Sequence, residues 1–394
     1  MKILHLMPYC PTPPMFGGAL RIYHILKNLV QFHDVTVMMF GGVKNEKDMR
    51  VVFDGQLEQL IVVPPPVSVK MRRLSQFYAF WTNRSFFHLL GSSKEMQQML
   101  QRVFEGKRFD IVFIEFPHMA GYDFPANTVK ILDSHNIEYE IYRQLWMNSR
   151  LSLRKIHYRQ EYNNLYRYEV EVCSKQNAIF TTSENDKAIL NMHCPAIPKY
   201  VIPNGVDMTY FKPTNEIPDP YRLIFTGMMG YLPNYDGMEY FLDAIFPLIR
   251  EKIPQTKITI AGSSPPKSLL RCASSSVTIT DFVPDVRPYI NQAAVYVVPL
   301  RMGSGTRLKI LEAMAMKKPV VTTKAGCEGI DVVHGESAMI ADRPEEFADA
   351  VVRLLQNASL RKKISQNGNE LARTHYDWSV IGRQMDSIFQ NLVH

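Results

Sequence analysis

Short apolar runs rich in β-branched residues recur along the chain, and most of them alternate with segments of helical periodicity. The runs that predict strands lie at 2–7, 35–40, 59–63, 111–114, 129–132, 178–183, 223–226, 257–261, 277–279, 293–298 and 319–323. The run at 293–298 is apolar throughout, which is typical of a strand that is buried on both faces. The alternation of strands and helices predicts an α/β protein with two parallel-sheet domains.

The alternation is interrupted once, near the middle of the chain. The segment Asn204–Pro220 contains three prolines and little periodicity, which is typical of an interdomain linker. We therefore expect an N-terminal domain at 1–205, a linker at 206–220, a C-terminal domain at 221–375 and a closing helical segment at 376–394.

The stretch Pro299–Ala315 is the strongest candidate for a ligand site. It follows the apolar strand at 293–298, turns at Gly303-Ser304-Gly305, and continues as a helix that we expect to span 306–316 with Thr306 as its cap. A strand, a glycine turn and a helix N-terminus together form an anion site, because free backbone N–H groups and the helix dipole point into the turn.

Two cations in the first turn of that helix strengthen this interpretation. Arg307 and Lys309 lie where a positive charge is unfavourable by about 0.3–1 kcal/mol. A broken local rule of this kind is expected at functional sites, and a bound diphosphate would explain it. The alternative is that both side chains are solvated on the surface.

Two further candidates lie where parallel sheets bind ligands, near the carboxyl ends of strands. Gly17-Gly18 forms a turn after the first predicted strand, and its backbone can approach a ligand closely. The turn lacks the Gly-x-Gly-x-x-Gly dinucleotide fingerprint, and an ordinary turn is the alternative. His135 follows the strand at 129–132 and is a candidate catalytic residue, with a structural histidine as the alternative.

Composition narrows the class of protein. The chain has 394 residues, of which 46% are hydrophobic, and no run approaches the roughly 18 apolar residues of a spanning helix. The first residues predict a strand and not a signal peptide. The five cysteines have no paired spacing, which indicates a reducing cytosol and no zinc site: Cys10, Cys173, Cys194, Cys272 and Cys327. A net charge of +7 favours anionic partners without identifying them.

One basic segment also carries many aromatic residues. Val69–Leu90 contains four Lys and Arg residues among six Phe, Tyr and Trp residues and has no acidic residue. This composition suits an anionic membrane surface, and a core helix with a solvated basic edge is the alternative. Arg143–Lys175 is a second basic, tyrosine-rich stretch, which acidic residues dilute.

The order of the motifs resembles a known family over nearly the whole chain. Gly17-Gly18, IPNGVD at 202–207, a strand that ends in Gly227, and the LEAMA–P–VV–T pattern at 311–322 are similar to the family 4 retaining glycosyltransferases, which belong to glycosyltransferase group 1. The resemblance implies the GT-B fold, in which two Rossmann-like domains face a central cleft. It also implies that the closing helix returns to the N-terminal domain.

The resemblance implies roles for individual residues. Glu312 matches the family's second conserved glutamate, which contacts the donor's ribose, and Ser304 stands where the first would be. The loop 228–237, which includes Asn234, lacks the family's diphosphate-binding Arg and Lys, so Arg301, Arg307 or Lys309 would supply that charge. The remaining donor contacts that the resemblance implies are Gly17, Gly18, Gly227, Val283, Gly305 and Thr306, with His135 near the reacting sugar carbon.

The activity implied is transfer of a sugar from a UDP- or GDP-linked donor to a glycan or lipid-linked acceptor, as in bacterial polysaccharide and exopolysaccharide synthesis. It proceeds with retention and without metal or cofactor, and the chain has no Asp-x-Asp motif. We expect a cytoplasmic enzyme, bound peripherally to the inner face of the membrane through 69–90, with no nucleic-acid partner. A nucleotide-sugar 2-epimerase and a non-catalytic nucleotide-sugar-binding subunit are the alternatives.

Overall fold

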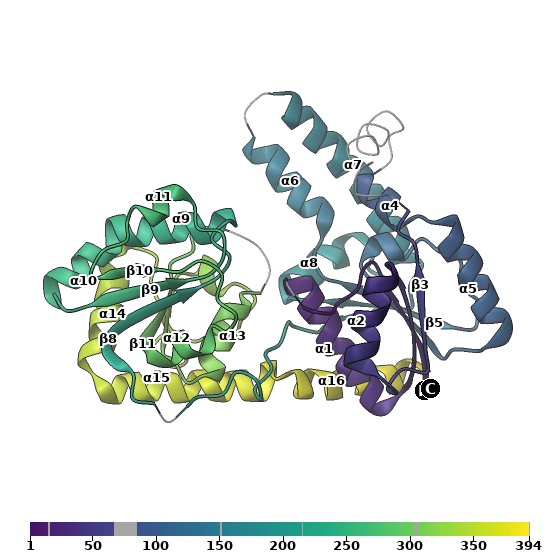
Figure 1. Cartoon of the computed structure of the whole chain (residues 1–394). Coiled ribbons are helices and arrows are strands. Elements are labelled where there is room, and N and C mark those ends of the chain that lie inside the picture. The colour runs from purple at the N-terminus through teal and green to yellow at the C-terminus, as the bar shows by residue number, and fades with distance from the viewer. Residues whose placement is uncertain (15, 67–84, 150–151, 215, 303–305, 394) are drawn as a thin grey trace. The chain divides into compact units, whose positions relative to one another are not determined.

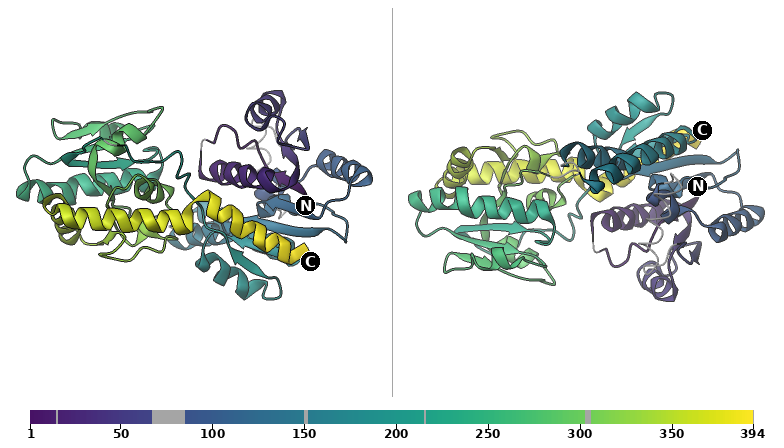
Figure 2. Two further views of the ribbon diagram at one scale, coloured as in Figure 1. Left: turned by 90° about the horizontal axis from the view of Figure 1, so that it is seen from below. Right: turned by 90° about the horizontal axis from the view of Figure 1, so that it is seen from above.

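The computed structural model describes residues 1–14, 16–66, 85–149, 152–214, 216–302 and 306–393. The chain forms two compact units, of which the first comprises Met1–Ile202 and Gly382–His394 and the second comprises Pro203–Ile381. Each unit is a parallel sheet with helices packed against both of its faces (Figures 1 and 2).

Unit 1 contains a seven-stranded sheet in the order β3-β2-β1-β4-β5-β6-β7. Its strands are β1 (Lys2–Met7), β2 (Asp34–Phe40), β3 (Gln59–Val63), β4 (Ile111–Glu115), β5 (Val129–Ser134), β6 (Ala178–Thr181) and β7 (Lys199–Val201). Its helices are α1 (Gly17–Phe32), α2 (Val43–Phe53), α4 (Phe86–Gly91), α5 (Lys94–Gly106), η2 (Pro117–Met119), α6 (Glu138–Asn148), α7 (Leu153–Ser174) and α8 (Glu184–His193). β4 is buried along its whole length, and β1 is buried from Ile3 onward.

Unit 2 repeats this plan with six strands in the order β10-β9-β8-β11-β12-β13. Its strands are β8 (Asp219–Thr226), β9 (Lys257–Ala261), β10 (Val277–Ile279), β11 (Ala293–Val298), β12 (Val320–Thr322) and β13 (Met339–Ile340). Its helices are α9 (Leu232–Tyr240), η3 (Phe241–Ile245), α10 (Phe246–Lys252), α11 (Lys267–Leu270), α12 (Arg287–Gln292), α13 (Leu308–Ala315), η4 (Ala325–Cys327), α14 (Pro344–Gln356), α15 (Ala358–Leu371), η5 (Ala372–Tyr376) and the start of α16 (Trp378–Val393).

The final helix contributes to both units. From Gly382 onward, α16 belongs to unit 1, where Phe389 is fully buried and its ring stacks on Phe180 with centroids 5.8 Å apart. Just before α16, Val206 and Asp377 of unit 2 form an isolated parallel β-bridge through their backbones.

Both strand orders place a topological switch point at the centre of the sheet. In unit 1 the chain direction across the sheet reverses between β1 and β4, and in unit 2 it reverses between β8 and β11. Open α/β sheets bind ligands beyond the carboxyl ends of the strands at such a point. The loops that follow these four strands are therefore the places to look for a site.

Candidate functional site

A lysine ammonium group lies beside the glycine turn at the switch point of unit 2. A Cβ atom added at Gly227, just after β8, would lie 2.7 Å from Lys309 Nζ. Lys309 Nζ donates a hydrogen bond of 2.7 Å to Asn234 Oδ1 and lies 4.0 Å from the ring centroid of Phe225. Since both of these contacts are with uncharged groups, the lysine charge remains available to an anion in the turn.

The ionisation of Lys309 is coupled to that of Glu312, one helical turn further on. Burial lowers the pKa of Lys309 to about 7, although Glu312 partly opposes this shift. Burial likewise raises the pKa of Glu312 to about 7, against the effect of Lys309. The two groups therefore change charge near neutral pH, and perturbed pKa values of this kind are common at functional sites.

Two glycines, one after β8 and one after β9, allow the turns that follow these strands to pack against each other. A Cβ atom at Gly262, after β9, would lie 1.8 Å from the carbonyl oxygen of Gly227, and Gly262 has a φ of 155°. No side chain fits at Gly262, so the two turns pack backbone to backbone. Asn234 closes the loop by donating from Nδ2 to the Met228 carbonyl oxygen at 2.9 Å.

The helix after β11 starts later than the sequence predicts. We expected it to span 306–316 with Thr306 as its cap, but α13 begins at Leu308 and its N-cap residue, Arg307, makes no capping bond through its side chain. Thr306 Oγ1 is buried and has no hydrogen-bond partner within the described residues. Its side chain therefore does not cap the helix.

The other residues predicted in unit 2 have different surroundings. Arg307 is 8% exposed, and burial lowers its pKa, so it is not a solvated surface residue. Arg301 is exposed and makes a two-point ion pair with Asp236 at 2.6 and 3.0 Å, which neutralises its charge. Val283 lies in the loop after β10 and is partly exposed. Ser304 and Gly305 lie outside the described residues.

In unit 1, His135 belongs to a buried network of ionisable groups at the carboxyl ends of β4 and β5. His135 Nε2 lies 2.6 Å from Glu115 Oε2 and 3.3 Å from Asp133 Oδ2. Glu115 Oε1 bonds His5 Nε2 at 2.6 Å, while Arg21 donates two bonds of 2.7 Å to Asp133. The Phe116 ring lies against His135 with centroids 3.9 Å apart.

This network favours a protonated His135. Burial alone would lower the pKa of His135, but the Asp133 and Glu115 carboxylates outweigh it and raise the pKa. Burial would raise the pKa of Asp133, yet Arg21 and His135 hold it well below its usual range. The carboxylates at the switch point of unit 1 therefore favour the protonated form of His135.

Glu115, Asp133 and His135 are close enough together to hold a metal ion, with all three ligand atoms within 4.8 Å. The atoms that would bind the metal already take part in hydrogen bonds within the network. Both oxygens of Asp133 accept bonds from Arg21, and the two oxygens of Glu115 face His5 and His135. An ion would have to displace these nitrogen groups, so the residues fit a hydrogen-bond network better than a metal site.

Gly17 and Gly18, which the sequence predicts as a turn, are the first two residues of α1, which begins beside this network. A Cβ atom at Gly18 would lie 2.7 Å from Tyr9 Oη. That hydroxyl is buried without a hydrogen-bond partner within the described residues, and burial, followed by Glu115 and Glu138, raises its pKa. The neutral Tyr9 hydroxyl, a hydrogen-bond donor, therefore lies against the Gly18 backbone next to the His135 network.

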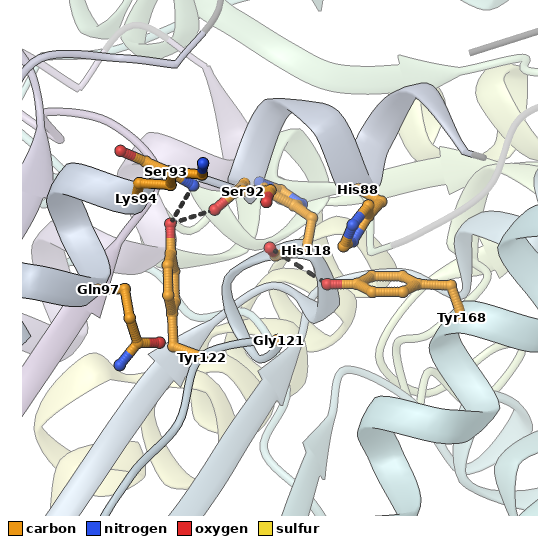
Figure 3. A pocket seen from close by; sticks show the side chains of 10 residues that line it. His88, Ser92, Ser93, Lys94, Gln97, His118, Gly121, Tyr122 and Tyr168 are labelled. Atoms are coloured by element: carbon orange, nitrogen blue, oxygen red, sulfur yellow. Dashed lines mark hydrogen bonds between the residues drawn. The ribbon is translucent and has the colours of Figure 1, made fainter. Parts of the chain in front are cut away.

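A cavity of about 170 Å³ is lined by residues of α4, α5, η2 and α7 (Figure 3). It is lined by His88, Gly91, Ser92, Ser93, Lys94, Gln97, His118, Gly121, Tyr122 and Tyr168. Burial, together with His135, lowers the pKa of His118 to about 4, so this ring is neutral at physiological pH. Aromatic rings and uncharged polar groups side by side suit a sugar ring, which has apolar C–H faces and a hydroxyl rim.

Two glycines and two tyrosine hydroxyls shape this cavity. A Cβ atom at Gly91 would lie 1.8 Å from the His118 carbonyl oxygen, and one at Gly121 would lie 2.8 Å from Tyr168 Oη. Tyr122 Oη donates to the Gly91 carbonyl oxygen and accepts a bond of 3.1 Å from Ser93 N. The Tyr168 hydroxyl points to the His118 carbonyl oxygen at 3.4 Å (Figure 3).

Most of the proposed membrane segment at 69–90 lies outside the described residues. Its end forms α4, whose N-cap Ser85 accepts a bond from Phe87 N. Across the described residues, no helix combines the length and apolar character needed to cross a bilayer.

Comparison with known proteins supports one family. Residues 220–357 match the family described as "Glycosyl transferases group 1". An "uncharacterized 44.6 kDa protein in cps region" of Klebsiella pneumoniae is 24% identical over 95% of this chain and 96% of its own. The capsular polysaccharide biosynthesis glycosyltransferase CapM of Staphylococcus aureus is 23% identical, covering 48% of this chain and 53% of its own.

The fold has close structural counterparts. The crystal structure of Anabaena Alr3699/HepE in complex with UDP aligns with a TM-score of 0.71 over 99% of this chain and 100% of that one, at 15% identity. At this identity the likeness establishes the fold alone, and it confirms the two Rossmann-like sheets that the sequence predicts.

Proposed function

Because the chain belongs to the group 1 glycosyltransferases and has the GT-B fold, we propose that it transfers a sugar from a nucleotide-sugar to a glycan or lipid-linked acceptor during synthesis of a cell-surface polysaccharide. The sugar keeps its anomeric configuration, and neither metal nor cofactor takes part. The name of CapM places that relative in capsular polysaccharide synthesis, which supports the proposed pathway. The HepE structure contains UDP, which supports a nucleotide-linked donor.

The single observation that carries the proposal is the position of Lys309. Its ammonium group faces the Gly227 turn at the switch point of unit 2 and is held by the neutral Asn234. A diphosphate bound in this turn would receive the lysine charge, while Glu312 would accept hydrogen bonds from the ribose. Lys309 thus takes over the role of the cations that the loop 228–237 lacks.

The reaction we infer is a front-face displacement. The bond between the anomeric carbon and the diphosphate oxygen breaks, and the diphosphate leaves with the electron pair. The acceptor hydroxyl oxygen bonds to the anomeric carbon on the same face, and its proton passes to the leaving diphosphate. Lys309 stabilises the charge that builds on the diphosphate, since a fixed cation acts most strongly where charge develops.

We assign the acceptor to unit 1, where the cavity beside His118 would receive one of its sugar rings. His135, whose protonated form the surrounding carboxylates favour, lies in the same unit. The substrate is handled at the cytoplasmic face of the membrane in this proposal.

Binding of nucleoside diphosphates to the Glu312→Ala variant tests the donor site. A carboxylate on two ribose hydroxyls makes charge-assisted hydrogen bonds worth about 1.5–3 kcal/mol, so affinity should fall at least tenfold in calorimetry. Glu370→Ala, which removes an exposed carboxylate of the same unit, is the control. Equal affinity of the Glu312 variant and wild type for UDP and GDP would make Glu312 a structural residue.

Chelation tests metal independence. The carboxylates nearest to His135 are already bonded to nitrogen groups, so we expect turnover in EDTA to equal turnover without it. Complete loss of turnover in the chelator, with recovery in Mg²⁺ or Mn²⁺, would contradict this part of the proposal.

The product distinguishes the two alternatives. A 2-epimerase would release free nucleotide and sugar without any acceptor, and a binding subunit would hold the nucleotide-sugar without consuming it.

A further inference from the structure

The side chain of Asn234 is fixed by contacts at both ends of its amide. Asn234 Oδ1 accepts a hydrogen bond of 2.7 Å from Lys309 Nζ, and Nδ2 donates one of 2.9 Å to the Met228 carbonyl oxygen. A lysine ammonium group only donates hydrogen bonds, and a carbonyl oxygen only accepts them, so these two neighbours admit one orientation of the amide. The amide therefore presents its acceptor atom to Lys309.

The backbone that carries Asn234 is fixed as well. Asn234 lies in the first turn of α9, where its N–H donates to the Tyr231 carbonyl oxygen at 3.0 Å. The residue is 7% exposed, and its Nδ2 atom would lie 2.9 Å from a Cβ atom added at Gly227. Asn234 therefore packs directly against the turn that follows β8, and a side chain on Gly227 would displace it.

The remaining contacts of Lys309 constrain its ammonium group less closely. Nζ lies 4.0 Å from the ring centroid of Phe225, an attraction that holds the charge over a ring face without directing an N–H group. The charged groups that act on it, Glu312 and Arg307, lie close to it in the chain. Fixing a lysine side chain costs up to about 2 kcal/mol of rotamer entropy. The hydrogen bond to Asn234 is the contact that gives the ammonium group a defined direction.

The amide holds Lys309 without cancelling its charge. Another member of the same loop, Asp236, shows the contrast, because its carboxylate pairs with Arg301 at 2.6 Å. A carboxylate next to a cation stabilises the charged form by supplying the opposite charge, and less of the field is then left for a ligand anion. A neutral acceptor such as Asn234 Oδ1 fixes the position of the lysine and leaves its charge for the ligand.

We propose that Asn234 is a positioning residue, and that the loop 228–237 serves the donor site by holding Lys309 at the Gly227 turn. The inference rests on the proposed function, in which Lys309 meets the diphosphate. It differs from the direct donor contact that the family resemblance implies for Asn234, because both polar atoms of the amide already have partners within the protein. Asn234 thus acts on the donor through Lys309.

A double-mutant cycle on the full-length protein tests this inference, with UDP and GDP as the probes. Asn234→Ala, Lys309→Met and the combined variant are compared with wild type by calorimetry at a pH below the Lys309 pKa of about 7. Asn367→Ala is the control, because it removes an exposed asparagine of α15 whose Nδ2 donates to the Glu336 carbonyl oxygen at 3.1 Å. The melting temperature establishes that each variant is folded.

We expect Asn234→Ala to weaken nucleotide binding about tenfold, because a small displacement of a group that meets the ligand is costly. The combined variant should bind no more weakly than Lys309→Met, because Asn234 has nothing to hold once the lysine is removed. Asn367→Ala should bind as wild type does.

Asn234→Asp is a second variant, which keeps the size of the side chain. It should bind nucleotide more weakly than Asn234→Ala, because its carboxylate pairs with Lys309 and repels the diphosphate. If Asn234 only filled space, the aspartate would be the milder substitution.

Two results would overturn this inference alone. The first is an equal loss from Asn234→Ala with and without Lys309, which would make Asn234 a direct ligand contact or an independent part of the fold. The second is wild-type affinity in Asn234→Asp. In both cases wild type binds the nucleotide and the proposed function stands. A wild-type protein that binds neither UDP nor GDP would overturn the proposed function and this inference with it.

Discussion

Lys309 shows how a residue that contradicts a local rule can mark a site. Its position early in a helix is visible in the sequence, and in the structure its ammonium group lies beside the Gly227 turn and donates to Asn234. Glu115 and Arg21 were not predicted, because the sequence separates them widely from His135 and only the sheet order brings them together. A carboxylate at the end of the strand at 111–114 was the available signal for Glu115.

We predict that Lys309→Met lowers the single-turnover rate at saturating donor by two to three powers of ten. This is roughly the effect of removing one group that stabilises a developing anion. Lys363→Met, which removes an exposed lysine of α15, is the control and should leave the rate unchanged. A normal rate in K309M would move the diphosphate contact to another cation.

The same substitution should not destabilise the unliganded protein. The folded-state pKa of Lys309, about 7, is below its unfolded value of about 10.4, so the charge costs stability at neutral pH and the cost fades as pH rises. We therefore expect the melting temperature of K309M at pH 7 to equal or exceed that of wild type. A marked decrease would show that Lys309 is a structural residue.

His135 and His118 should give unit 1 opposite pH dependences. The raised pKa of His135 means that its contribution to stability is present below about pH 6.5 and is lost as pH rises through the folded pKa. The pKa of His118, about 4, means that stability is lost as pH falls from about 6.5 towards 4. Hydrogen exchange of β4 and β5 measures both effects within unit 1.

We expect His135→Gln to lower the protection of β4 and β5 by about 3 kcal/mol at pH 6 and by less at pH 9, since it leaves buried carboxylates without a partner. His118→Gln is the matched variant and should instead reduce the loss of protection on acidification. The same pH profile for both variants would contradict the assigned charge states.

At the scale of elements, most strands and helices follow from the sequence, and the exceptions have physical causes. The helical stretch from Leu232 to Lys252 is divided into α9, a π-helical turn at Phe241–Ile245, and α10, with Pro247 at the start of α10. The short edge strands β7 and β13 were not predicted, because three and two residues carry too little pattern. The start of α13 was placed too early, because Thr306 resembles a cap but keeps its hydroxyl free of the helix.

The paired turns after β8 and β9 give a prediction at this scale. Gly262→Ala would place a Cβ atom 1.8 Å from the Gly227 carbonyl oxygen, so the turn that faces Lys309 would have to move. We expect unit 2 to lose about 3 kcal/mol or more in denaturant unfolding and to lose nucleotide binding with it. Gly106→Ala, where an added Cβ atom meets nothing within 4 Å, is the control. A stable Gly262 variant that binds nucleotide normally would show that the close packing is not required.

At the scale of the whole molecule, alternating strands and helices predicted two parallel sheets, and the structure confirms both. The strand order was not readable from the sequence, because periodicity identifies strands but not their neighbours. The order matters for function, since it places the Gly227 turn and the His135 network at the switch points of their sheets. The return of α16 to unit 1 depends on tertiary packing around Phe389, which local pattern does not encode.

Transfer of labelled sugar is the most direct test of the central claim. The full chain is incubated with radiolabelled UDP- and GDP-sugars, with and without a bacterial lipid extract, and the products are separated and their anomeric configuration is read by NMR. We predict that label enters the lipid or glycan fraction only when acceptor is present, with the donor's configuration retained. Release of free sugar at the same rate without acceptor, or binding of every donor without consumption, would contradict the account.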